Sequence, residues 1–271
     1  MCSIAKDENL YIKEFVNHYK NLGYTHFYLY DNNDKNGGKF EDIIFEEIKD
    51  GLVTIINYRG FRGHEGGPQM DAYYNCYENY KKNCDWISFF DIDEYLILEP
   101  NNTSFKSLLL NERYKNCDGI SINWKIFTDN HLLEYNNISI KERFKQEKKK
   151  FRERFTKLIQ RTNIKYNLNK SFSTHNPWKN IKLCNTLGKR ISPIISITPP
   201  SFNYMHLNHY YTKTISEFCN KLKRGNAVYN YTLNTDILKK KFNIFFMINE
   251  KTKEKVKIFN KRFNTTFKLT I

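Results

Sequence analysis

Apolar and polar residues follow two different periods in the first hundred residues. Apolar side chains recur at helical spacing in three segments, at residues 12–19, 40–48 and 68–80. Short apolar and aromatic runs, typical of buried strands, lie between them at residues 25–30, 52–57 and 86–90. Strands that alternate with helices in this way predict βαβ units. We therefore predict an α/β protein whose mixed, mostly parallel central sheet is flanked by helices.

The alternation loosens after Pro100. Here the pattern predicts helices at residues 104–110 and 214–224, and strands at residues 119–124 and 157–161. Residues 141–155 are dense in charge, which favours a solvated helix or a loop insertion. We predict one domain over residues 1–235, with a first half at about 1–100 and a second half at about 101–235. The basic tail, residues 236–271, is predicted to be helical and packed on the body.

Composition narrows the class of protein. The 271 residues include 21 Phe and 19 Tyr, too many aromatic side chains for a disordered chain. No apolar run is long enough to predict a transmembrane segment. The six cysteines form no CxxC pair, and the first residues lack the apolar stretch of a signal peptide. We therefore expect reduced thiols and a cytoplasmic protein.

The net charge of +15 is unevenly distributed. Residues 1–100 hold 10 Lys and Arg against 18 Asp and Glu, a net charge of −8, and the remaining residues hold 34 against 11, a net charge of +23. The excess of carboxylates in the first half favours the binding of a cation there. The basic second half predicts association with an anionic acceptor, surface or partner, and nucleic acid is not the favoured partner.

Two carboxylates lie directly after a predicted strand. Asp91 and Asp93 are two residues apart after the aromatic run 86–90, so an extended backbone turns both to one side. The carboxyl end of a strand is where open α/β sheets bind ligands, and paired carboxylates favour Mg²⁺ or Mn²⁺ between them. An exposed acidic turn is the alternative interpretation.

Three other polar positions are candidates. His206 and His209 are three residues apart and could share a helical face, or His209 alone could reach a metal. A hydrogen-bonded core histidine is the alternative. Asp31 follows the predicted strand 25–30, where it could bind a base or ribose or begin the turn to Gly38.

These segments, in this order, resemble metal-dependent glycosyltransferases of the family 2 and family 92 type, which have a GT-A fold. The resemblance spans roughly residues 2–230. The matching segments are Ala5-Lys6-Asp7-Glu8, residues 26–32, Gln69 with residues 72–76, residues 86–95, Asn123-Trp124 with Phe127, residues 157–161, residues 208–213 with Glu217-Phe218, and Lys221 with Arg224-Gly225. Asp7 stands where the family usually has Asn.

The resemblance implies a role for each matching residue. Lys6, Glu8, Asp31, Asp91 and Arg224 would bind the nucleotide-sugar, Arg224 together with Lys221 at the diphosphate. Asp93 and His209 would bind Mn²⁺ or Mg²⁺. Trp124 and Phe127 would border the sugar and the acceptor.

The catalytic base is less well defined by the resemblance, because residues 128–131 depart from the family's usual sequence. Asp129 is the candidate we choose, and Glu134 is the alternative. The resemblance implies transfer of a sugar from a nucleotide-sugar, with UDP as the expected nucleotide, to an acceptor hydroxyl with inversion. The acceptor would be a glycan, a protein or a lipid.

Three other functions fit some of the same features. A nucleotidyltransferase could use the same fold, carboxylates and metal. A basic nucleic-acid- or partner-binding protein would need no catalysis, and a degenerate transferase would bind nucleotide without turnover. The sequence contains no GxGxxG, GxxxxGK[ST] or GxSxG motif, so the dinucleotide, P-loop and α/β-hydrolase classes lack their signatures.

Overall fold

The computed structural model describes residues 1–64, 67–100, 104–164, 181–192, 199–225 and 233–268. The strands in this part of the chain are β1 (Cys2–Ala5), β2 (Phe27–Asp31), β3 (Val53–Asn57), β4 (Trp86–Phe89), β5 (Glu94–Leu98), β6 (Gly119–Ile126), β7 (Thr156–Arg161), β8 (Leu183–Cys184) and β9 (Met205–His209). The helices are α1 (Ile12–Asn21), α2 (Phe45–Lys49), α3 (Pro68–Tyr80), α4 (Phe105–Leu109), α5 (Ile140–Arg143), α6 (Ile215–Lys223), α7 (Thr235–Ile248) and α8 (Lys253–Phe263), with short 3₁₀ turns at Lys81–Asn83 and Glu112–Tyr114.

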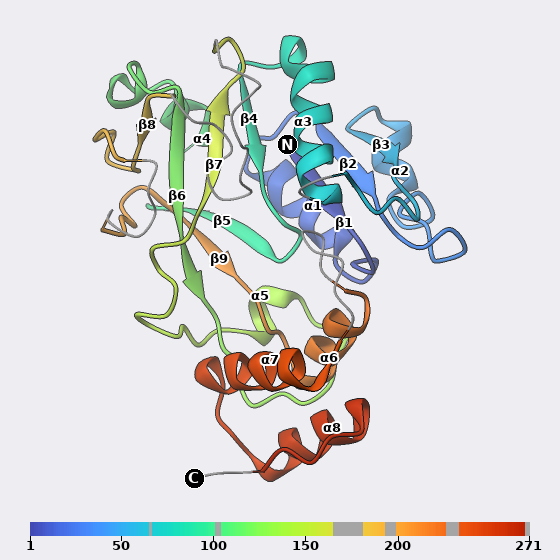
Figure 1. The fold of residues 1–271 in the computed structure, drawn as a ribbon. Coiled ribbons are helices and arrows are strands. Elements are labelled where there is room, and N and C mark those ends of the chain that lie inside the picture. Colours follow the sequence, from blue (N-terminus) through green and yellow to red (C-terminus); the bar gives the residue numbers. More distant parts are fainter. Residues whose placement is uncertain (65–66, 101–103, 165–180, 193–198, 226–232, 269–271) are drawn as a thin grey trace.

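These strands form a mixed sheet in the order β3-β2-β1-β4-β7-β6-β9-β5, with β8 paired to β6. The first four strands run parallel to one another. Strand β7 is antiparallel to both of its neighbours, β4 and β6, and β5 is antiparallel to β9. Helices α1 and α3 flank the first half of the sheet (Figure 1). The predicted α/β class, with a mostly parallel central sheet flanked by helices, is confirmed.

Alternation along β2 explains how the two faces of the sheet are covered. Phe27 and Leu29 belong to the apolar cluster on the α1 side, whereas Tyr28 and Tyr30 belong to the cluster that contains the apolar face of α3. The α1-side cluster also takes residues from β6, β9 and α7. Both predicted halves of the chain and part of the tail therefore contribute to one core.

The strand register brings three loops together at one edge of the sheet. Ala5 at the end of β1 pairs with Asp31 at the end of β2, and Cys2 of β1 pairs with Phe89 at the end of β4. The segments that follow β1, β2 and β4 therefore lie beside one another at the carboxyl edge of the sheet, which is where α/β sheets bind ligands.

Several local predictions differ from the structure. The helix predicted over residues 40–48 is reduced to α2, and the buried side chains of Phe40 and Ile44 precede it. Residues 141–155 contain only the end of α5 and are otherwise irregular, which agrees with the predicted loop insertion and not with the alternative of a helix. His206 and His209 lie on strand β9 and not on a helix, because β9 is held between β6 and β5. Strand pairing of this kind overrides local periodicity.

The tail packs through aromatic side chains against α6. Phe242, Phe245 and Phe259 of α7 and α8 share an apolar cluster with Phe218 of α6. Beside this cluster, Lys255 of α8 lies 2.7 Å from the carboxylate of Asp129, and both side chains are buried. Helices α6, α7 and α8 gather at one end of the molecule (Figure 1). Among the described helices, none has the length and apolar character that crossing a bilayer requires.

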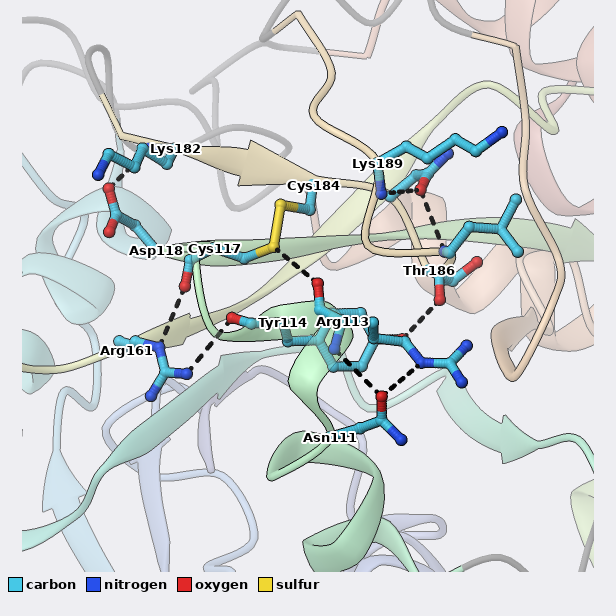
Figure 2. Close-up of a disulfide and its surroundings, with 12 residues drawn as sticks. Asn111, Arg113, Tyr114, Cys117, Asp118, Arg161, Lys182, Cys184, Thr186 and Lys189 are labelled. Atoms are coloured by element: carbon cyan, nitrogen blue, oxygen red, sulfur yellow. Dashed lines mark hydrogen bonds between the residues drawn. A yellow bond between two sulfur atoms is a disulfide. The ribbon is translucent and has the colours of Figure 1, made fainter.

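A disulfide joins Cys117, just before β6, to Cys184 in β8 (Figure 2). The expectation that all six thiols are reduced is therefore wrong for this pair, while Cys2, Cys76, Cys84 and Cys219 are free. The two residues are 67 apart in the sequence and belong to no motif, so spacing gave no signal. Because disulfides persist in oxidising compartments, this bond argues against the cytoplasmic location that we predict from the sequence.

We predict that Cys117→Ser lowers the free energy of unfolding by about 2–4 kcal/mol, because the bond closes a loop of 67 residues in the unfolded chain. Urea unfolding with and without dithiothreitol measures this loss. The reductant should destabilise the wild type and leave the Cys117→Ser variant unchanged. Cys84→Ser, which alters a free thiol, is the matched control and should respond to dithiothreitol as the wild type does.

A second prediction concerns the Asp129–Lys255 pair. Asp129→Ala leaves a buried ammonium without its carboxylate, which costs about 3–5 kcal/mol. The double variant Asp129→Asn/Lys255→Met removes both charges and should recover most of that loss in a urea unfolding series. A loss below about 1 kcal/mol in Asp129→Ala would show that the pair does not anchor the tail.

Candidate active site

A cavity of about 300 Å³ opens at the carboxyl edge of the sheet. Its wall combines the segment after β1, the segment after β4, Trp124 of β6, His209 at the end of β9, and residues of α6 and α7. Pockets that hold small-molecule ligands have volumes of roughly 300–1,000 Å³. The cavity is therefore large enough for part of a nucleotide-sized ligand, and it contains both carboxylates of the Asp91-Ile92-Asp93 motif.

Asp91 is held from two neighbouring elements. Its Oδ1 accepts hydrogen bonds from Gln69 Nε2 at 2.5 Å and Tyr73 Oη at 3.2 Å, both on α3. Its Oδ2 lies 2.9 Å from Lys157 Nζ on β7. Partial burial would raise the pKa of Asp91, but the Lys157 ammonium outweighs it and lowers the pKa below its usual value. Asp91 is therefore ionised, and with 34% of its side chain exposed it faces the cavity.

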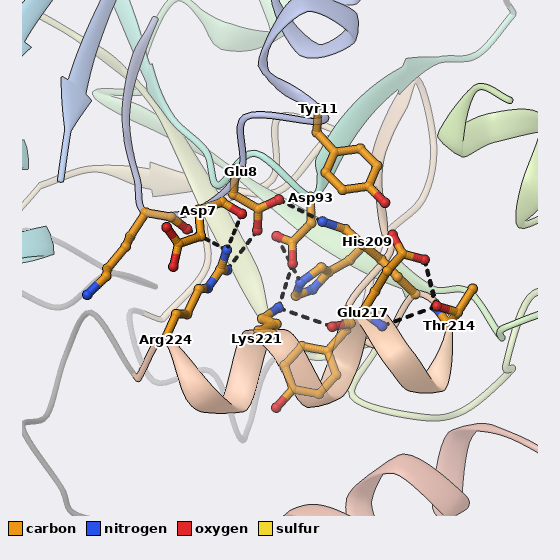
Figure 3. Close-up of polar contacts among 12 residues, drawn as sticks. Asp7, Glu8, Tyr11, Asp93, His209, Thr214, Glu217, Lys221 and Arg224 are labelled. Atoms are coloured by element: carbon orange, nitrogen blue, oxygen red, sulfur yellow. Dashed lines mark hydrogen bonds and ion pairs between the residues drawn. The ribbon is translucent and has the colours of Figure 1, made fainter. Parts of the chain in front are cut away.

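Asp93 lies between a lysine and a histidine. Its Oδ2 accepts a hydrogen bond from Lys221 Nζ at 2.6 Å, and its Oδ1 lies 3.5 Å from His209 Nε2 (Figure 3). Burial opposes ionisation of Asp93, but Lys221 and His209 bring its pKa well below the usual range. Burial lowers the pKa of His209 despite the nearby carboxylate, so its imidazole is neutral near pH 7.

Glu94 lies behind this pair and is fully buried. Its Oε2 accepts the backbone N–H of Asp91, and its Oε1 lies 4.0 Å from His209 Nδ1. Burial raises the pKa of Glu94 well above its usual value, although Lys157 opposes this effect. The Oε1 and Nδ1 atoms are too far apart for a hydrogen bond. Glu94 therefore holds the backbone at Asp91 and does not fix the imidazole of His209.

Glu8 ties the segment after β1 to the far side of the cavity. Its two carboxylate oxygens each lie 2.7 Å from a cation, Lys213 Nζ and Arg224 Nη2 (Figure 3). Burial would raise the pKa of Glu8, but Arg224 and Lys213 hold it below its usual value. Arg224 follows α6, which begins with a capping box between Thr214 and Glu217. The start of α6 thus fixes the helix that carries Lys221 and Arg224 to the cavity.

The cavity wall has a positive surplus. Seven cations line it against three carboxylates, Glu8, Asp91 and Asp93, which leaves four positive charges in excess. The cations are Lys6, Arg62, Arg152, Lys157, Lys221, Arg224 and Lys241. The acidic character of the first half therefore does not extend to this wall, which suits an anionic ligand.

Most of the predicted site residues meet at this cavity. Those that line it are Lys6, Glu8, Asp91, Asp93, Trp124, His209 and Arg224. Asp31 does not line it, because its buried carboxylate pairs with Arg59 at 2.8 Å, and the next residue, Asn32, takes its place in the wall. Phe127 also lies outside the wall and packs against Tyr210, with 5.2 Å between the ring centres.

The two candidates for the catalytic base lie elsewhere. Asp129 is directed to Lys255 in the tail, so a base at this position would face an ammonium group and not the cavity. Glu134 accepts a hydrogen bond from Ser216 Oγ at 2.6 Å and does not line the cavity. His206, on the opposite face of β9 from His209, lies near Glu99 and also has no place in the wall.

The donor set fits a divalent cation only in part. In the described part of the chain, no group of three or more His, Cys, Asp and Glu side chains is arranged to hold a metal. Asp93 Oδ1 and His209 Nε2, however, converge to 3.5 Å, and both are donors that Mn²⁺ accepts. Lys221 occupies only the other oxygen of Asp93. The residues therefore fit a cation that takes its remaining ligands from water or from a bound diphosphate.

Four residues that shape the cavity lie in the segments that resemble the family but received no role from the sequence: Gln69, Glu94, Lys157 and Lys213. Lys157 reaches Asp91 because β7 runs antiparallel beside β4, with Leu158 opposite Phe89. A single lysine at the start of an apolar strand gives no local signal of such a contact. Glu94 directly follows the Asp91-Ile92-Asp93 motif. Its position after a buried aromatic strand was the sequence signal that could have identified it as part of the site.

Comparison with known proteins places the chain in a family. The model of glycosyltransferase family 92 matches residues 1–254 and so extends through α7 to the start of α8, beyond the residues 2–230 that we expect to resemble the family. Family 92 glycosyltransferases of Arabidopsis thaliana and Oryza sativa subsp. japonica are 28% and 23% identical over 121 residues, which are 41% and 42% of this chain. The matched residues span about a fifth of the length of these relatives, 20% and 18%.

Among solved structures, the chain shows a weak similarity to S. aureus TarS. TarS 1-349 has 14% sequence identity and a TM-score of 0.38, and the match covers 91% of this chain and 69% of that one. TarS 1-349 in complex with UDP-GlcNAc has 13% identity and a TM-score of 0.36, with 96% and 80% covered. TM-scores this low do not establish a common topology. The family model covers nearly the whole sequence, and on that match the chain belongs to glycosyltransferase family 92.

Proposed function

We propose that the chain transfers a sugar from a nucleotide-sugar, with UDP as the nucleotide, to an acceptor hydroxyl with the help of Mn²⁺ or Mg²⁺. One observation carries the proposal: Asp93 Oδ1 and His209 Nε2 converge within a cavity whose charged lining residues are mostly cations. Membership of family 92 supports the reaction class. The acceptor is a glycan, a protein or a lipid.

The chain's own cations suit the diphosphate of the donor. Lys221 and Arg224 lie one helical turn apart near the end of α6, and each is already bonded to a carboxylate of the cavity. A diphosphate that enters beside them accepts hydrogen bonds from the same donors, and the planar guanidinium of Arg224 can bind two oxygens at once. Lys6 and Asn32 also line the cavity, and the nucleoside would lie beside them.

Asp93 and His209 would hold the divalent cation. When bound, the cation neutralises charge that develops on the leaving diphosphate. The chain's residues contribute in the same direction, because Lys221 and Arg224 are fixed in place before the donor arrives. Water is restricted at this point, since the side chains of Asp93 and His209 are 6% and 5% exposed.

Inversion of the anomeric configuration adds one requirement to the proposed reaction. An inverting transferase needs a base on the acceptor side of the sugar. Each carboxylate that lines the cavity in the described part of the chain contacts a cation, and Asp91 is the one whose side chain is most exposed. The anomeric configuration of the product, measured by NMR before it equilibrates, decides between inversion and retention.

The other functions predict different products. A nucleotidyltransferase consumes a nucleoside triphosphate and releases pyrophosphate, whereas the proposed reaction releases a nucleoside diphosphate. A nucleic-acid binder shows steep salt dependence and no response to substitutions at Asp93. Family 92 membership favours glycosyl transfer over both. Peripheral association with an anionic surface stays a prediction, for which the exposed lysines at 253, 257 and 261 of α8 are the candidates.

We predict that Asp93→Asn weakens Mn²⁺-dependent UDP binding at least tenfold, or by about 1.4 kcal/mol. The amide keeps the shape of the side chain but loses the charge that holds the cation. Isothermal titration of UDP with Mn²⁺ and with EDTA measures the change, and hydrolysis of UDP-sugars should fall in parallel. Asp236→Asn, an exposed change on α7, is the matched control and should behave as the wild type. Equal UDP affinity and hydrolysis in Asp93→Asn and the wild type would contradict the proposal.

A further inference from the structure

Three cations of the cavity wall form no ion pair with any residue that the structure describes. Lys6, Lys157, Lys221 and Arg224 all lie within 2.9 Å of a carboxylate oxygen, and the three that remain are Arg62, Arg152 and Lys241. Arg152, in the loop before β7, and Lys241 of α7 belong to the second half of the chain. All three charges at the cavity wall are thus available to a ligand.

Arg152 is placed among aromatic rings. Its guanidinium carbon lies 5.6 Å from the ring centre of Phe155 and 5.4 Å from that of Tyr211. Phe155 stacks on Trp124 with 5.4 Å between the ring centres and an angle of 10° between the planes. The backbone of Arg152 has a φ of +54°, a conformation that few non-glycine residues adopt. The loop thus presents an arginine beside the indole that borders the cavity.

Tyr211 contacts both this arginine and a cation of the proposed diphosphate site. Lys221 Nζ lies 4.6 Å from the centre of the Tyr211 ring, and the Arg152 guanidinium lies 5.4 Å from the same centre. Lys241 of α7 and Phe218 of α6 also line the wall. Arg152 therefore belongs to the part of the wall formed by Trp124 and Tyr211, and Lys241 is the cation that α7 contributes to the same cavity.

The bound donor would not neutralise all of the positive charge on this wall. The wall has four positive charges in excess. A nucleoside diphosphate-sugar brings about one negative charge on each of its two phosphates, and a bound divalent cation would cancel them. A positive surplus therefore remains after the donor has bound. A second anion beside it is favoured.

We propose that the acceptor is a saccharide that carries a carboxylate or a phosphate, and that Arg152 and Lys241 bind this group while Trp124 contacts the sugar ring. This inference rests on the proposed function, because it assigns the second substrate of the same cavity. A fork of guanidinium donors pairs well with either anion. Aromatic faces beside it suit the apolar face of a pyranose.

The test uses the protein saturated with UDP and Mn²⁺, so that the diphosphate site is already filled. Glucuronate, glucose 6-phosphate and glucose serve as probes, and saturation-transfer NMR titrations give their affinities. We expect one or both of the anionic probes to bind at least fivefold more tightly than glucose, and the better one identifies the group as carboxylate or phosphate. Arg152→Gln and Lys241→Gln should each remove most of this preference. Lys239→Gln, an exposed change on the same helix as Lys241, should leave it intact.

Three results would overturn the inference. Equal binding of glucose and both anionic probes would show that the wall does not select an anion, and an unchanged preference in both variants would place the anion elsewhere. A loss of UDP affinity in Arg152→Gln or Lys241→Gln, with acceptor preference retained, would assign these cations to the donor. Failure of UDP and Mn²⁺ to bind the wild type would instead refute the proposed function, and the two failures are therefore distinguishable.

Discussion

Buried charge is the constraint on which this structure depends. Glu8, Asp93 and Lys213 have almost no access to water, and an isolated charge in such a position costs several kcal/mol. Each is compensated by a partner from a distant part of the chain: Glu8 by Lys213 and Arg224, and Asp93 by Lys221. The segments after β1 and β4 can therefore be buried only when α6 is docked against them. Folding of the first hundred residues and placement of α6 are coupled through these pairs.

The same pairs explain how the cavity can be both stable and receptive to an anion. Lys221 and Arg224 are satisfied by carboxylates in the free protein, so the charges of these two side chains are compensated before the donor binds. The guanidinium of Arg224 has further donors, some of which bond the backbone carbonyls of Lys6 and Asp7. A donor diphosphate can join this network without replacing it. Preorganised donors of this kind need little rearrangement during the reaction.

Local sequence patterns predicted the helices and strands whose formation depends on neighbouring residues in the sequence. The helical spacing at residues 12–19 and the Pro68 start correspond to α1 and α3, and the aromatic run ending at Asp91 corresponds to β4. Strand β9 was not predictable, because its five residues become a strand only between β6 and β5. The contacts of Asp31 with Arg59 and of Asp129 with Lys255 also depend on long-range packing. A carboxylate beside a strand end looks the same in sequence whether its partner is a ligand or a buried cation.

The boundary between a catalytic body and a basic tail at residue 235 has little physical basis in the packing. Phe245 of α7 lies 5.1 Å from Phe218 of α6, ring centre to ring centre, and α6 is the helix that carries Lys221 and Arg224. Removal of the tail would expose this aromatic cluster and leave Asp129 without its cation. The loss of stability would reach the cavity through α6, so a deletion cannot separate the tail's charge from its packing. Single charge substitutions on exposed positions of α7 and α8 can, because they leave the aromatic contacts in place.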